Sequence, residues 1–159
     1  MKKIALLGLL AAALILFVYP KIQTMMLDEV VVEHARSAPA APDTPMAGYM
    51  TITNHSDRDE ILVGVMADSA DFKSAEVHES FEENGVAKMQ HIEAIPLPKG
   101  ESLVLKPRSY HLMLMQPQKS FSVGDAFTVT LKFKSGHTID VPISIVPRDQ
   151  IGGMSGHSH

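Results

Sequence analysis

The feature that most constrains the fold is a series of short segments in which apolar and polar residues alternate. Alternation with a period of two is typical of β-strands that bury one face. Nine such segments follow residue 27, and no stretch after that point has the periodicity of a long amphipathic helix. They cover residues 29–34, 49–53, 61–66, 75–79, 86–92, 102–105, 110–115, 127–133 and 138–145. The sequence therefore predicts an all-β domain, an antiparallel sandwich or barrel with Greek-key connections.

Turn and loop residues separate these segments. Residues 83–85, Glu-Asn-Gly, predict a tight hairpin turn, and residues 135–136, Ser-Gly, predict another short connection. Residues 37–45 contain three prolines and are expected to form a loop, as are residues 96–100. The sequence therefore predicts strands joined by short connections, and it contains no internal repeat.

The N-terminus has the pattern of an exported protein. Lys2 and Lys3 precede 16 residues, 4–19, whose only polar side-chain group is the hydroxyl of Tyr19. As a helix this run is about 24 Å long, shorter than a bilayer core of about 30 Å. No small-residue cleavage site follows it, however. We therefore expect residues 1–27 to form a hydrophobic helix that anchors the protein in the inner membrane, in preference to a signal peptide whose cleavage leaves a soluble protein.

The positive-inside rule places the remaining chain in the periplasm or another extracytoplasmic space. We expect one working domain at residues 28–148 and a flexible, Gly/Ser-rich tail at residues 149–159. Three lysines precede Asp28, so the exported part carries 11 basic and 18 acidic residues, a net charge of −7. An acidic domain is a poor nucleic-acid binder.

The chain contains no cysteine but ten methionines and eight histidines. Without a thiol it has no disulfide, thiolate zinc site, iron–sulfur cluster, blue-copper centre or cysteine nucleophile. Thioether and imidazole groups both bind soft or borderline metals. The excess of these two residue types is the first indication of a metal-binding function.

The segment at residues 110–115 places an imidazole and a thioether on one strand face. Side chains alternate between faces along a strand. Leu112 and Leu114 are therefore expected to point to the core, while His111 and Met113 share the other face with Met115. Such a pair can converge on one ion, although an apolar strand with one tolerated histidine has the same pattern.

Two further donors lie on other segments. His78 and Met89 are both predicted to point away from the core, although each alone is more typical of a surface histidine and a packing methionine. Together with His111 and Met113 they form the pattern H-x10-M-x21-H-x-M. This pattern resembles the signature of the periplasmic copper chaperone family called PCu(A)C. The resemblance extends from about Val30 to Val146 and includes residues 47–54, 77–79, 105–107 and 110–114.

The resemblance implies a cupredoxin-like Greek-key β-sandwich in which these four residues bind Cu(I) near the surface. Copper(I) is a soft ion that accepts thioethers and imidazoles, whereas zinc favours thiolate, imidazole and carboxylate ligands. The chain departs from the family pattern at two places. His34-Ala35 stand before Arg36 where the family often has an aromatic residue, and Arg108-Ser109 replace the usual glycines.

Other residues are secondary candidates. His91 and Met115 either touch the metal or only line the site, and Glu76 and Glu79 either orient His78 or are solvated carboxylates. The tail is either disordered or captures Cu(II) through Met154, His157 and His159. The remaining predictions are packing roles for Met46 and Met50 and solvent exposure for His34, His55 and His137.

The function predicted from these observations is copper carriage, not catalysis. By resemblance, the acceptor is the copper-bearing subunit of cytochrome c oxidase, reached directly or with a Sco-type protein. The alternative is a metal-free adhesion or assembly module on the same sandwich, in which the four donors would be scattered. A hydrolase or oxidase is disfavoured because the sequence shows no nucleophile elbow, paired catalytic carboxylates or oxidase-like histidine cluster.

Overall fold

The computed structural model describes residues 30–151, which form ten strands and one short 3-10 helix. No helix among these residues is long and apolar enough to cross a membrane. The elements are β1 (Val30–Ser37), β2 (Met46–Asn54), β3 (Glu60–Ala67), β4 (Phe72–Glu83), β5 (Val86–His91), β6 (Ile95–Leu97), β7 (Ser102–Leu105), β8 (Tyr110–Pro117), β9 (Ala126–Phe133), β10 (Thr138–Ile145) and η1 (Arg148–Gln150). The all-β prediction is therefore confirmed for the described residues.

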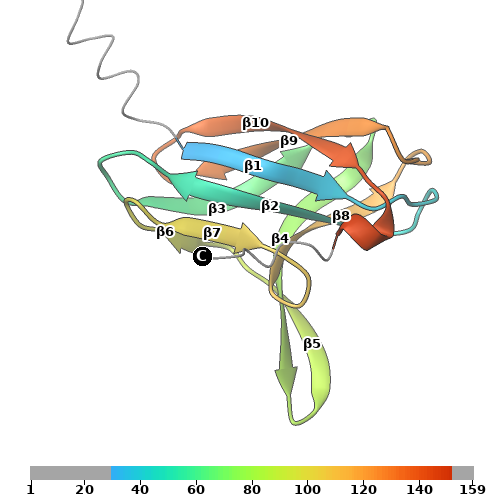
Figure 1. Ribbon diagram of the computed structural model, residues 1–159, viewed down its shortest axis with the longest axis horizontal. Helices are drawn as coiled ribbons and strands as arrows, with labels where there is room; N and C mark the ends of the chain where they lie inside the picture. Colours follow the sequence, from blue (N-terminus) through green and yellow to red (C-terminus); the bar gives the residue numbers. More distant parts are fainter. Residues whose placement is uncertain (1–29, 152–159) are drawn as a thin grey trace, which may run out of the picture.

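The strands form one hydrogen-bonded path in the order β5-β4-β8-β2-β1-β10-β9-β3-β6, and β7 pairs with β2. Strands β3 and β4 lie near opposite ends of this path, yet they contact each other. The sheet therefore curls into a sandwich around one core (Figure 1). Pairing of non-consecutive strands, such as β8 with both β2 and β4, requires the crossing connections of a Greek key.

The core follows from the alternation in the sequence. Strand β2 buries every second residue without interruption, and Leu112 and Leu114 of β8 are fully buried as predicted. Three phenylalanines, Phe72, Phe121 and Phe127, pack with ring centroids 4.8–5.3 Å apart at one end of the core. Burial of such side chains is the main source of stability in a domain this small.

Two strands differ from the sequence predictions. Residues 95–97 form the edge strand β6, although residues 96–100 were predicted to be a loop. Pro96 suits this place because an edge strand can lose a backbone donor. The segment at residues 86–92 was predicted to be half-buried, but all six residues of β5 are exposed.

The exposure of β5 follows from the shape of the molecule. Strand β4 is 12 residues long, and its second half extends beyond the sandwich and pairs with β5. Figure 1 shows this hairpin projecting from the body. Its turn is at Asn84 and Gly85, which both have positive φ, as the predicted Asn-Gly turn requires. The predicted N-terminal helix at residues 1–27, and most of the tail, lie outside the described residues.

Candidate metal centre

Three histidines form a row at the junction of the body and the hairpin. His78 of β4 lies directly opposite His111 of β8, and on its other side it lies opposite His91 of β5. Directly paired residues of antiparallel strands point to the same face. The opposite face at this point is the core, where Val77 pairs with Leu112. The row therefore lies on the outer face of the sheet.

The two predicted methionine ligands lie on different sides of this row. Met113 is opposite Glu76 in the body, whereas Met89 is opposite Ser80 on the hairpin. From ideal strand spacings the Cα atoms of the two methionines are roughly 16 Å apart. The structure therefore brings His78, His111 and Met113 together, and it places Met89 farther out, with 49% of its surface exposed.

The hydrogen bonds of the two imidazoles leave one nitrogen of each ring open. Nδ1 of His111 lies 3.0 Å from the carbonyl oxygen of Ser109. Nε2 of His78 lies 2.9 Å from Oε2 of Glu76. A carbonyl and an ionised carboxylate only accept, so each of these nitrogens carries the proton. The lone pairs are therefore on Nε2 of His111 and Nδ1 of His78, the geometry expected of ligands held by an outer hydrogen bond.

The burial of these rings fits a ligand role. Nδ1 of His78 is buried and has no hydrogen-bond partner among the described residues. The ring centroids of His78 and His111 are 6.2 Å apart. With metal–nitrogen bonds of about 2.0–2.1 Å, two imidazoles that share an ion have centroids at most about 6.4 Å apart. The two rings are therefore within the limit for binding one ion.

Glu76 was one of the two carboxylates proposed to orient His78, and it does form that hydrogen bond. Its Oε2 also lies 3.4 Å from Nδ1 of His91. The hydrogen bond from His78 lowers the pKa of Glu76. Glu79 does not share this role, because it accepts a hydrogen bond from Gln90 instead.

A pocket of about 210 Å³ opens beside His111 and Met113. Tyr49 and Arg108 also line it, and burial raises the pKa of the Tyr49 phenol. Arg108 has φ 63°, a left-handed conformation that favours glycine. The turn nevertheless presents the carbonyl of Ser109 correctly, since this oxygen accepts from both His111 and the Ser80 amide.

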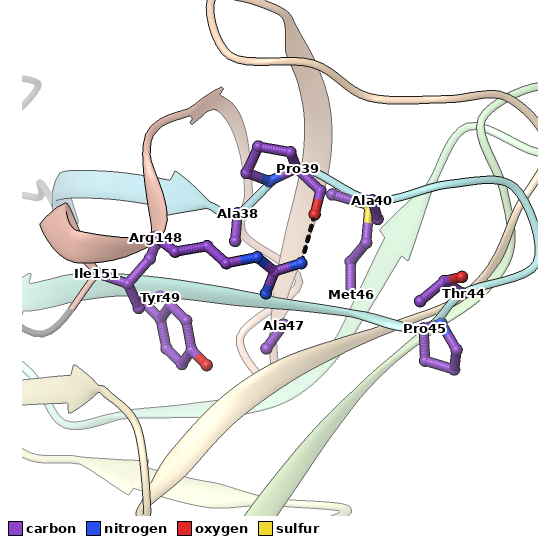
Figure 2. Close-up of a pocket in the computed structure, with 10 residues that line it drawn as sticks. All are labelled: Ala38, Pro39, Ala40, Thr44, Pro45, Met46, Ala47, Tyr49, Arg148 and Ile151. Carbon is purple, nitrogen blue, oxygen red and sulfur yellow. Dashed lines mark hydrogen bonds between the residues drawn. The ribbon is translucent and has the colours of Figure 1, made fainter.

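A neighbouring pocket of about 260 Å³ shares its lining at the first residues of β2 with the pocket beside His111 (Figure 2). Arg148 crosses it and donates a hydrogen bond from Nη2 to the carbonyl oxygen of Pro39, at 2.9 Å. Its lining contains a guanidinium but neither an imidazole nor a carboxylate. This pocket is therefore unsuited to a cation, and the candidate metal ligands lie on the β4–β8 side.

The other predicted residues are placed as follows. Met46 and Met50 are buried in the core and His34, His55 and His137 are exposed, as predicted. Met115 is half-buried on the same strand face as Met113 and lies opposite Ser74, away from the histidine row. His91 contacts the carboxylate that holds His78, a link that only strand register reveals. Met154, His157 and His159 lie outside the described residues.

Comparison with known proteins supports the fold. Residues 30–145 match the family described as "Putative lipoprotein LpqE-like". A protein from Leifsonia xyli described as "Putative lipoprotein Lxx21020" is 30% identical over 107 residues, which are 67% of this chain and 63% of that protein. An uncharacterised protein from Rickettsia prowazekii, RP573, is 29% identical over 110 residues, 67% of this chain and 60% of that protein. The chain thus matches less than two thirds of the length of either relative.

Two solved structures are also similar. A copper-bound PCuAC domain from PmoF2 has a TM-score of 0.60 and 24% identity, and the match covers 76% of this chain and 95% of that domain. The Cu(I) form of DR1885 from Deinococcus radiodurans has a TM-score of 0.56 and 27% identity, with 76% and 82% of the two chains covered. The described residues therefore have the fold of these domains.

Proposed function

The chain belongs to the LpqE-like family and has the fold of PCuAC domains, and on that premise we propose that it is an extracytoplasmic copper chaperone and not an enzyme. The family resemblance inferred from the sequence is thereby confirmed. In this proposal the chain holds Cu(I) through His78, His111 and Met113, and Met89 completes the set. The N-terminal segment anchors the protein to the inner membrane.

The observation that supports this proposal most is the pairing of β4 with β8. It puts two imidazoles opposite each other, each with one nitrogen held by an oxygen and the other open. Met113 adds a thioether on the same face. Copper(I) accepts few ligands, imposes little geometry and prefers this soft donor set.

Met89 enters this proposal as the exchangeable ligand. It lies on the exposed hairpin and reaches the ion only if the hairpin bends toward β8. A ligand that detaches by such a movement leaves a coordination position open to an incoming donor. Copper can then pass to an acceptor by stepwise ligand exchange.

The proposed acceptor is the copper-bearing subunit of cytochrome c oxidase, with or without a Sco-type protein as intermediary. In the tail, Met154, His157 and His159 are proposed to capture Cu(II). Deletion of residues 152–159 should then weaken Cu(II) binding, and unchanged binding would remove this part of the proposal. Oxidase activity under copper limitation, with and without the protein, tests the acceptor.

Competition with a colorimetric Cu(I) chelator tests the main site. The wild type should bind one strong equivalent. His111→Ala should weaken it by more than about 100-fold, because loss of even an outer partner of a metal ligand costs about 10–100-fold. His55→Ala is the matched control, since His55 is exposed in a turn away from the site. Equal affinity of the two variants would contradict the proposal.

A further inference from the structure

A second set of donors overlaps the proposed copper(I) site. Glu76, His78 and His91 each offer one ligand atom, and these atoms lie within 4.8 Å of one another. Oε2 of Glu76 is 2.9 Å from Nε2 of His78 and 3.4 Å from Nδ1 of His91. Donors around a tetrahedral ion with bonds of about 2.0–2.2 Å are about 3.3–3.6 Å apart. Small rotations of the half-exposed His91 would therefore gather the three atoms around one ion.

The chemistry of this set differs from that of the copper(I) ligands. It contains two imidazole nitrogens and a carboxylate oxygen, with no sulfur, and the carboxylate brings a negative charge. Borderline divalent ions such as Cu(II) and Zn(II) prefer such donors, whereas Cu(I) prefers thioethers. We propose that Glu76, His78 and His91 form a divalent-cation site, for Cu(II) or Zn(II), that competes with the copper(I) site for His78.

The competition follows from the single lone pair of a neutral imidazole, and this step rests on the proposed copper(I) function. In the copper(I) site His78 uses Nδ1, while its Nε2–H is held by Glu76. In the divalent site His78 uses Nε2 beside Glu76, so its proton must move to Nδ1. One ring cannot serve both ions at once. The chain therefore holds either a monovalent or a divalent ion at this junction.

The two sites should differ in strength. In the divalent form the Nδ1–H group is buried, and no acceptor among the described residues is bonded to that atom. A buried donor without a partner is costly. Binding of the divalent ion should consequently be weaker than binding of copper(I). Among divalent ions, Cu(II) should bind more tightly than Zn(II).

Zinc titration of the full-length apo-protein tests the site, because zinc is redox-inert. His91→Ala and Glu76→Gln should each weaken zinc binding at the proposed site by at least about tenfold. Loss of a supporting residue of a metal site has an effect on this scale. Met113→Leu should leave zinc binding unchanged while it weakens copper(I) binding. Zinc that binds to other residues, including the tail, contributes equally to the wild type and to these variants, so the differences between them report on the proposed site. Equal zinc binding in the wild type and His91→Ala would overturn the proposal.

Competition between the ions tests the shared histidine. Zinc at ten times its Kd should lower the apparent Cu(I) affinity of the wild type about elevenfold, by simple competitive linkage, and should have little effect on His91→Ala. Strong Cu(I) binding that zinc does not affect would overturn the shared-ligand proposal and leave the copper carrier intact. Zinc binding that depends on His91, in a protein without strong Cu(I) binding, would instead overturn the carrier and support the divalent site.

Discussion

The two halves of the candidate metal centre are built differently. On the β8 side His111 is only 6% exposed, and its ring is fixed by the carbonyl of Ser109 and backed by the fully buried Leu112. On the β5 side both His91 and Met89 are about half exposed, and no residue of that strand is buried. His78 lies between them and pairs with both strands. The comparison indicates a buried, preformed half and an exposed, adjustable half, and in the proposed function the first holds the ion and the second exchanges it.

The largest expected effect is on stability, and it distinguishes buried residues of the body from exposed residues of the hairpin. Leu112→Ala should lower the free energy of unfolding by about 2–5 kcal/mol, because it leaves a cavity under the histidine row. Val86→Ala, on the 58% exposed Val86 of the hairpin, should change it by less than about 0.5 kcal/mol. Urea unfolding followed by circular dichroism measures both. Similar losses would show that the hairpin is packed as tightly as the body.

The next effect separates the two thioethers. Leucine preserves the volume of methionine but lacks its sulfur. Met113→Leu should therefore weaken Cu(I) binding at least about tenfold, or about 1.4 kcal/mol. Met89→Leu should weaken Cu(I) binding less but accelerate the release of copper to a chelator, because the exposed Met89 is the ligand that detaches in the proposed function. Competition titration and stopped-flow transfer measure the two quantities, with Met66→Leu, an exposed methionine on β3, as control.

A larger affinity loss for Met89→Leu than for Met113→Leu would reverse the assignment of the two halves. It would mean that the hairpin folds firmly onto the ion in the bound form. The separation of the two methionines described above would then not persist in the copper-bound protein.

The smallest effect concerns the turn that leads into β8. Arg108 has φ 63°, and a side chain in this region is strained. Arg108→Gly should raise the free energy of unfolding by about 0.5–1 kcal/mol, the relief of strain being partly offset by the greater freedom of glycine in the unfolded chain. Arg108→Ala removes the same charged side chain but keeps the strain, so it should bring no such gain. Thermal unfolding of the two variants isolates the backbone contribution.

Much of the fold could be predicted from the sequence because alternation is a local property. The ends of β10 and the turn at Asn84-Gly85 were predicted from residue order and turn chemistry alone. Strand β6 was missed because three residues containing a proline carry almost no periodic signal. The exposure of β5 was missed because its pattern does not reveal that β4 extends beyond the body.

The sequence by itself determined which donor groups the chain contains, namely thioethers and imidazoles without thiols. It also determined to which face of its strand each donor points. Only the tertiary structure decided which of them meet, because partners across a sheet are set by strand register, and register depends on packing far from the site. It put His78 opposite both His111 and His91, with the carboxylate of Glu76 between two of the rings. It also placed Met89 on a projecting hairpin, a position that the spacing of the four donors along the sequence does not reveal.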